Sequence, residues 1–181
     1  MIMRRISKQI VLAVALTFAV GAVAGETNSL AKGLEPLREL LGKTWKGYFK
    51  NSTPDKPVYD VAKWERAMNG QAVRVTHSVN DGKYGGESII MINPKTKGVE
   101  FYYFTTAGFY THGTVAFEGA KIITHEQVTG NEEGTTQTEG TTELLADGRM
   151  RVKTRYFRKG QWEDGRDMTY EVTPGAEVVF K

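Results

Sequence analysis

The sequence of 181 residues contains no cysteine, three histidines and five prolines. The lack of cysteine excludes disulfide bonds, thiolate metal sites and a thiol nucleophile. The histidines, His77, His112 and His125, are scattered singly, without the spacing that a histidine metal site needs. The sequence also lacks a nucleophile elbow, a phosphate-binding loop and a paired-carboxylate motif. No metal and no cofactor is therefore predicted.

Without residues 1–24, the chain also lacks an excess of positive or negative charge. Residues 1–24 combine three basic residues, an apolar run over 10–20 and the small-x-small pattern Ala22-Val23-Ala24, an order typical of a secretory signal peptide. The alternative, an uncleaved membrane anchor, is disfavoured because the apolar run is short for a spanning helix. Cleavage before Gly25 leaves 21 basic and 21 acidic residues. We expect a periplasmic or secreted protein with no stable membrane anchor after cleavage.

This balance of charge bears on the partners of the chain as well. Nucleic-acid binding needs a basic footprint to neutralise phosphates, and the chain without its first 24 residues has none. The sequence therefore predicts no nucleic-acid partner.

A short helix is the only helical pattern that the sequence shows. Residues 25–33 are small and polar, and they predict a flexible tail. Leu34, Leu37 and Leu40 then recur at helical spacing, and Gly42 follows as a stop. A helix this short is not stable alone, so we expect its leucine face to dock on the rest of the chain.

Strands and tight turns make up the remainder. Glycine-containing turns recur about every 12 residues, the interval of one strand and one hairpin turn. Side chains between the turns alternate in polarity; Val73, Val75 and His77, for example, share one face. About ten strands in one open sheet would leave two exposed edges, which closure removes. Residues 34–181 therefore predict an all-β domain, an antiparallel up-and-down β-barrel capped by the short helix, with 130–145 as an exposed hairpin or edge.

Two segments resemble known barrels. Residues 40–47, Leu-Leu-Gly-Lys-Thr-Trp-Lys-Gly, resemble the calycin superfamily, whose barrels open with a short helix followed by Gly and Trp at the first strand. Residues 89–98, Ile-Ile-Met-Ile-Asn-Pro-Lys-Thr-Lys-Gly, resemble the central hairpin of a lipocalin-like bacterial family of unknown function. The resemblance implies a small barrel whose interior cavity takes an apolar ligand.

The chain departs from these relatives in two places. Two residues separate Gly42 from Trp45, where lipocalins proper have one. The similar nitrobindin-type barrels bind haem through a histidine near the C-terminus, but no histidine follows His125. Haem binding is therefore not implied.

Strand parity points six candidate ligand-binding side chains into the lumen. These are His77, Phe101, Tyr103, Phe117, Glu126 and Tyr156. An inward His77 serves either as a ligand contact or base, or as a core histidine satisfied by a Tyr or Thr neighbour. Glu126 has three interpretations: an internal pair with His77 or an inward Arg such as Arg66, an anchor for a polar ligand head, or an outward position caused by a bulge.

These residues favour an exported binding protein that holds a small apolar or amphipathic ligand without a chemical step. One alternative is a lipocalin-type isomerase or cyclase that uses His77 or Glu126 as acid or base. Another is a structural or partner-binding barrel. The outward Tyr102, Phe104 and Tyr110 have three interpretations: a homodimer face, a seat for the leading helix, or ordinary surface packing.

Overall fold

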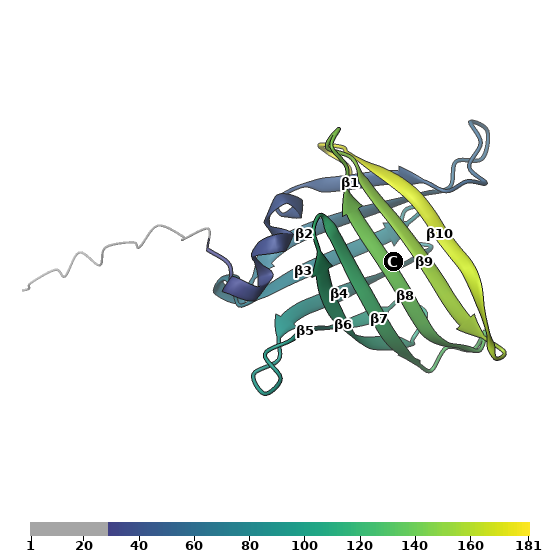
Figure 1. Ribbon diagram of the computed structural model, residues 1–181. Coiled ribbons are helices and arrows are strands. Elements are labelled where there is room, and N and C mark those ends of the chain that lie inside the picture. Colours follow the sequence, from purple (N-terminus) through teal and green to yellow (C-terminus); the bar gives the residue numbers. More distant parts are fainter. Residues whose placement is uncertain (1–28) are drawn as a thin grey trace, which may run out of the picture.

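The computed structural model describes residues 29–181, which form a closed barrel of ten antiparallel strands (Figure 1). Each strand pairs with its neighbours in sequence, and β10 pairs with β1 to complete the ring. The closing pair aligns Trp45 with Val172 and Gly47 with Tyr170. The predicted up-and-down barrel is therefore confirmed. The predicted signal peptide and the first residues of the predicted tail lie outside the described residues.

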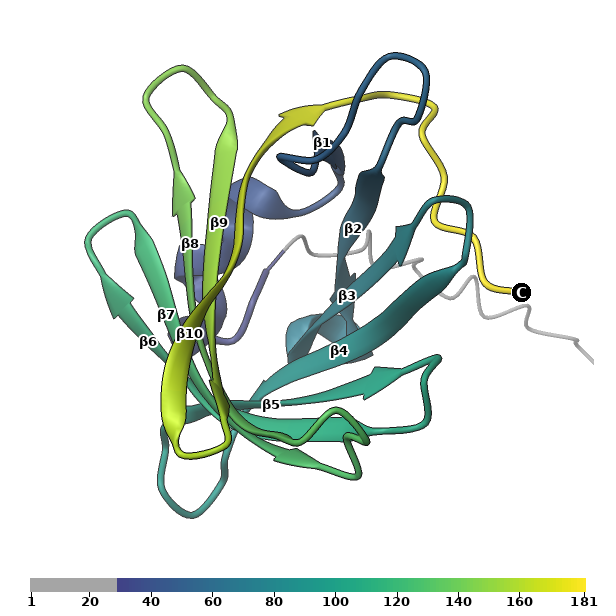
Figure 2. The same ribbon diagram turned by 90° about the vertical axis from the view of Figure 1, so that its right-hand side faces the viewer.

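The strands follow one another through short turns. They are β1 (Thr44–Tyr48), β2 (Tyr59–Ala67), β3 (Ala72–Val79), β4 (Tyr84–Ile92), β5 (Val99–Thr105), β6 (Tyr110–Glu118), β7 (Lys121–Thr129), β8 (Thr135–Leu144), β9 (Met150–Arg158) and β10 (Gln161–Val172). Because successive turns lie at opposite ends of an antiparallel meander, the β1–β2, β3–β4, β5–β6, β7–β8 and β9–β10 connections gather at one end (Figure 2).

The leading helix η1 (Lys32–Leu40) closes the other end of the barrel and is a 3-10 helix. Its leucines Leu34, Leu37 and Leu40 lie three residues apart, which places them on one face of a helix with three residues per turn. All three are buried in the same core cluster as inward-facing residues of the strands. A second 3-10 turn, η2 (Met68–Gly70), joins β2 to β3.

The structure differs from the sequence prediction at the start of the domain. The helix begins at Lys32 and not at Leu34. Leu30 is 7% exposed, and the Ala31 N–H donates to the Gly70 carbonyl at 2.8 Å. Of the predicted tail, Leu30 and Ala31 thus contact the barrel, and Lys32 and Gly33 belong to η1.

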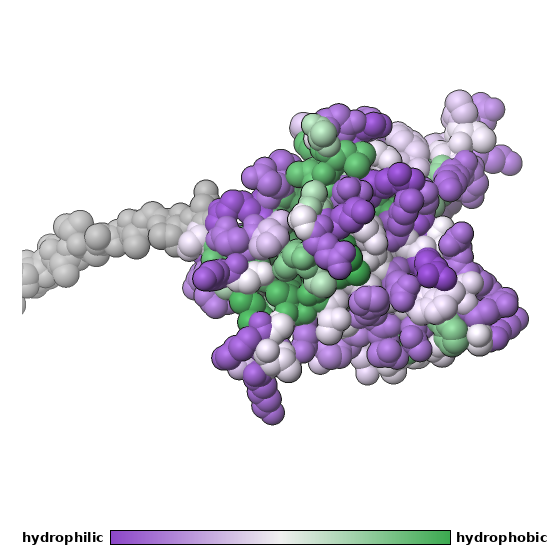
Figure 3. All heavy atoms as spheres, viewed as in Figure 1, coloured by the Kyte–Doolittle hydropathy of each residue, from purple (hydrophilic) through white to green (hydrophobic). Residues whose placement is uncertain are grey.

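The hydrophobic core fills the half of the lumen next to η1. Trp45 is completely buried there, and its indole N–H donates to the Leu40 carbonyl at 3.3 Å. Val73, Met150 and Tyr170 belong to the same cluster. On the face shown in Figure 3, hydrophobic side chains gather towards η1, whereas hydrophilic ones cover β8 to β10. The other half of the lumen lacks this filling.

Two segments depart from the expected arrangement of the sheet. Residues 130–145 are not an exposed hairpin or edge, because β8 is an ordinary barrel strand paired with both β7 and β9. After β10 the chain crosses the outside of the barrel, where the Val179 N–H donates to Ser78 Oγ at 3.0 Å (Figure 2). This crossing explains why Ser78, on the outward face of β3, is buried.

The outward aromatic residues are exposed, as strand parity predicts. Tyr102, Phe104 and Tyr110 are 41%, 53% and 41% exposed. They are not a seat for η1, because its leucines enter the end of the barrel. None of the helices within residues 29–181 has the length and apolar character needed to cross a membrane.

Candidate functional site

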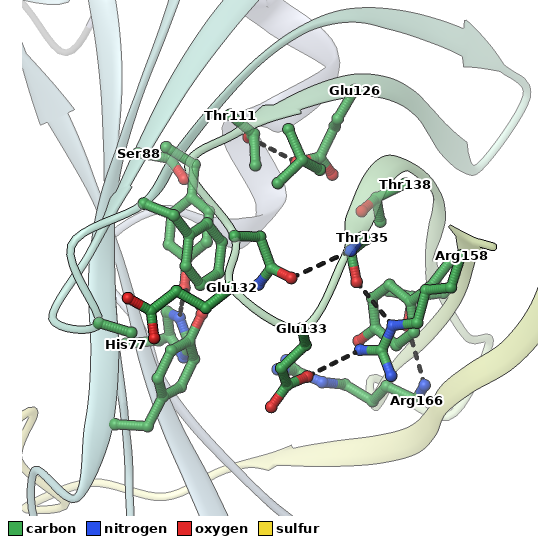
Figure 4. A pocket seen from close by; sticks show the side chains of 18 of the residues that line it. His77, Ser88, Thr111, Glu126, Glu132, Glu133, Thr135, Thr138, Arg158 and Arg166 are labelled. Carbon is green, nitrogen blue, oxygen red and sulfur yellow. Dashed lines mark hydrogen bonds and ion pairs between the residues drawn. The ribbon is translucent and has the colours of Figure 1, made fainter.

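The end of the lumen away from η1 contains a cavity of about 600 Å³ (Figure 4). The β5–β6 turn and the β7–β8 loop border it with Ala107, Phe109 and residues 131–133. Each strand from β3 to β10 contributes at least one inward side chain to its wall. This volume is in the range of natural small-molecule sites.

The structure brings five of the six predicted site residues together. His77, Phe101, Tyr103, Glu126 and Tyr156 all line this cavity. Phe117 does not, because it lies near the β6–β7 turn and packs against the core cluster at the η1 end. Period-two alternation gives the face of a strand on which a side chain lies, but not its depth along the barrel axis.

The cavity is more polar than the sequence suggests. Besides the predicted residues, its wall includes Ser88, Thr111, Thr135, Thr138 and Thr154. Two of them, Thr135 and Thr138, come from β8, which the sequence predicts to be an exposed hairpin or edge because it carries few large apolar residues. Threonine fits a β-strand because of its branched side chain, and its hydroxyl offers a ligand a donor or an acceptor.

His77 is held by partners on both ring nitrogens. Its Nδ1 lies 2.9 Å from Asp60 Oδ1, and its Nε2 lies 2.7 Å from the Tyr103 hydroxyl. In the tautomer whose Nδ1–H donates to the carboxylate, Nε2 accepts the Tyr103 O–H. The Tyr84 hydroxyl lies 2.9 Å from that of Tyr103 and extends the chain along the cavity wall. His77 thus has the Tyr neighbour expected of a core histidine whose hydrogen bonds are satisfied. Its ring also lines the cavity, so it can contact a ligand as well.

Asp60 is the buried centre of this network, and the sequence analysis missed it. The residue is 1% exposed and also contacts β10, where Tyr170 O–H donates to Oδ2 at 2.7 Å and Arg166 Nη1 lies 3.1 Å away. Burial by itself raises the pKa of Asp60, but the hydrogen bonds and positive charges of its partners outweigh burial and lower it. Asp60 is therefore ionised at neutral pH.

A β-bulge lies next to Arg166. The register of β10 against β9 shifts between Asp164 and Asp167, and the Arg166 N–H donates to Thr154 Oγ1 at 2.8 Å. Arg166 faces the lumen and Asp167 faces Arg151 on the outside, in step with the inward Met168 two residues after Arg166. Alternation therefore gives the inward face of Arg166, but not its pairing with Asp60, because that contact forms only when the ring of strands closes.

Aromatic rings of the cavity lie over glycines of neighbouring strands. A Cβ at Gly86 would clash with the Tyr103 ring, and one at Gly165 would clash with the Tyr156 ring. Burial raises the pKa of Tyr103, so its hydroxyl stays neutral. The glycines thus make room for the rings that shape the cavity.

Glu126 faces the cavity, so the outward position that a bulge would cause is not found. Its Oε2 accepts a hydrogen bond from Thr111 Oγ1 at 2.6 Å (Figure 4). Neither His77 nor Arg66 pairs with it; Arg66 Nε donates to the Ser29 carbonyl at 2.9 Å. Burial raises the pKa of Glu126, and the Thr111 hydrogen bond opposes that rise only partly.

The mouth of the cavity is held by a second polar cluster. Arg158 Nε donates to Thr135 Oγ1 at 2.6 Å, and its Nη2 lies 3.2 Å from Glu133 Oε2. Asn131 Oδ1 accepts the Thr135 N–H at 3.0 Å and so fixes the β7–β8 loop. Within residues 29–181, no group of three or more Asp, Glu or His is placed to hold a metal ion.

Comparisons with known proteins support the fold alone. No family model matches the chain, and a search of the curated proteins finds no match. The chain is similar to the crystal structure of Rv2717c from M. tuberculosis, with a TM-score of 0.58 and 17% identity. The similarity covers 80% of this chain and 99% of that one. A barrel of this shape is therefore found in another solved protein.

Proposed function

We propose that this protein binds a small amphipathic ligand in its lumen, without a chemical step. The observation that carries the proposal is the cavity of about 600 Å³ inside a barrel whose other half is filled by the core. Its wall combines aromatic surface with hydroxyl groups, which suits a ligand that has an apolar body and a polar group.

The geometry of the wall favours a preformed site. His77, Tyr84 and Tyr103 are fixed by hydrogen bonds to one another and to Asp60. Side chains held in this way lose little conformational entropy when a ligand arrives, so less of the binding free energy is lost to ordering.

We also propose that the chain belongs to the calycin superfamily, within its lipocalin-like bacterial family of unknown function. This proposal is supported by the closed barrel, the leading helix, and the Gly42 and Trp45 positions at the entry to β1. The structural similarity to Rv2717c, which covers 80% of this chain and 99% of that one, agrees with a relationship to such barrels.

Export to the periplasm or the medium is also proposed, on the basis of residues 1–24. Cleavage before Gly25 leaves the buried Leu30 and all of η1 in place. Intact-mass analysis of protein recovered from the periplasm or medium should show Gly25 as the first residue. A chain retained in the cell with its first 24 residues attached would contradict export.

A titration with the neutral fluorescent probe N-phenyl-1-naphthylamine tests lumen binding. We expect a saturable fluorescence increase with one probe per barrel. Ser88→Trp places a large ring in the cavity wall and should weaken binding at least tenfold, whereas the exposed Thr53→Trp should leave it unchanged. Absence of saturable binding, or equal binding by Ser88→Trp, would overturn the proposal.

A second candidate function, acid–base chemistry on the bound ligand, is favoured by the chain from Asp60 through His77 and Tyr103 to Tyr84. Such a chain can pass a proton between a cavity ligand and His77. We would incubate enolisable aryl ketones in D₂O and follow C–H exchange by NMR. Exchange that disappears in His77→Ala at unchanged melting temperature would support this candidate, and exchange no faster than in buffer would reject it.

A further inference from the structure

Glu126 is the cavity residue that combines a carboxyl shielded from solvent with the lack of a charged partner among residues 29–181. Arg166 and His77 both contact Asp60, and Arg158 contacts Glu133. Glu132 is exposed to solvent in the β7–β8 loop. Across residues 29–181, no Lys, Arg or His nitrogen lies within 4.0 Å of the Glu126 carboxyl. The cavity therefore contains a shielded carboxyl whose charge the described part of the chain does not balance.

The surroundings of Glu126 offer hydroxyl groups but no cation. Thr111 lies on one side of it on β6, and Thr138 is its direct partner on β8. The Thr138 side chain lines the cavity, and its hydroxyl has no partner in the part of the chain that the structure describes. Figure 4 shows Glu126 beside these threonines and away from Arg158 and Arg166.

An unpaired carboxylate in such a place is unfavourable, because removal from water penalises its charged form. A ligand that brings a positive charge restores the missing interaction, and charge-assisted hydrogen bonds to a carboxylate are among the strongest in proteins. An ammonium group also carries three N–H donors, which match the carboxyl and the threonine hydroxyls. A ligand carboxylate would instead face Glu126 while both cavity arginines are already paired.

We propose that the ligand is a primary amine with an aromatic or similarly flat apolar body. Its ammonium group binds Glu126 with the hydroxyls of Thr111 and Thr138, and its body lies against Phe101, Tyr103 and Tyr156. This inference rests on the proposed lumen-binding function, which it narrows to one class of ligand. Glu126 is then the residue that determines specificity.

Three indoles with the same ring separate the classes of ligand. Tryptamine carries the ammonium group, 3-ethylindole is its neutral counterpart, and indole-3-propionate carries a carboxylate. By isothermal titration calorimetry at neutral pH, tryptamine should bind at least tenfold more tightly than 3-ethylindole. Indole-3-propionate should bind more weakly than either.

The matched variants assign this preference to one side chain. Glu126→Gln keeps the shape of the residue and a hydrogen bond to Thr111, and it should remove the preference, so that tryptamine and 3-ethylindole bind with similar affinity. Glu132→Gln removes a charge at the exposed rim and should keep the full preference. A preference that persists in Glu126→Gln would overturn the inference.

The same titrations separate the inference from the function on which it rests. Equal affinity of the unmodified protein for tryptamine and 3-ethylindole would reject the amine assignment and leave lumen binding standing. Failure of all three indoles to bind would contradict lumen binding itself. The comparison of ligands on the unmodified protein does not depend on whether a variant folds.

Discussion

At the scale of single residues, Asp60 joins the network behind the cavity through three partners. It is the shared partner of His77, Arg166 and Tyr170, which come from β3 and β10. Its contacts span 17, 106 and 110 residues of sequence, so one carboxylate ties the two sides of the barrel together.

Removal of this charge should destabilise the fold strongly. Asp60→Asn leaves the Arg166 guanidinium without its counter-ion, and loss of one partner of a buried pair costs about 3–5 kcal/mol. Urea denaturation should show this loss, whereas the exposed Asp55→Asn should change little. Because the pKa of Asp60 is lowered by folding from 3.8, its stabilisation is present above that pH and is lost as pH falls further. A loss below 1 kcal/mol at neutral pH would contradict this role.

Glu126 should have the opposite effect on stability. Folding raises its pKa above 4.5, so the folded state disfavours the charged form, and its unfavourable contribution grows as pH rises above that value. Glu126→Gln should therefore stabilise the ligand-free protein at neutral pH by about 1–3 kcal/mol, the scale of an unsatisfied buried group.

The pH dependence of that gain provides the check. Denaturation at several pH values should show the difference between Glu126→Gln and the unmodified protein shrinking as pH falls to 4.5 and below, where the Glu126 carboxyl becomes protonated in the unfolded state as well as in the folded state. Glu118→Gln, at an exposed strand end, serves as control. A difference that stays constant with pH would be inconsistent with the unpaired carboxyl.

At the scale of secondary structure elements, the contact between β4 and β5 shapes the cavity. Gly86 on β4 gives the Tyr103 ring on β5 the space it occupies, and a Cβ there would clash with the ring and with the Phe104 carbonyl. Gly86→Ala should lower the free energy of unfolding by about 1–3 kcal/mol, as overpacking of a core does. It should also displace the Tyr103 hydroxyl from His77.

The matched control for this contact is Gly98→Ala in the β4–β5 turn, where the nearest atom, Thr96 Oγ1, lies 3.5 Å from the new Cβ. Melting temperatures and the imidazole NMR signals of His77 report the two effects. Equal melting temperatures of both variants, with unchanged His77 signals, would show that the close approach is unimportant.

The elements also show what local sequence patterns predict and what they miss. The leucine spacing at Leu34, Leu37 and Leu40 predicts a docked helix, but helices of 3.0 and 3.6 residues per turn both fit so few positions. The threonine-rich stretch that forms β8 resembles an exposed strand, because side chains that line a polar cavity look like side chains that face water.

At the scale of the whole molecule, alternation was enough to predict the closed barrel and the inward face of most strands. Five of the six predicted cavity residues follow from it. Phe117 does not, because the depth of a side chain depends on which end η1 fills. The pairing of Asp60 with Arg166 depends on the closure of the ring, which brings β2 near β10 and leaves no local signal in the sequence.

The ligand is proposed to bind in the cavity and not on the outer surface. A series of ¹H–¹⁵N correlation spectra during titration with N-phenyl-1-naphthylamine tests this proposal. Binding in the cavity predicts saturable shifts at Ser88, Thr111 and Thr138 on the cavity wall, with the exposed Tyr48 and Met91 unchanged. Shifts that cluster on exposed residues such as Tyr48 and Met91 while the signals of the cavity wall stay unchanged would contradict it.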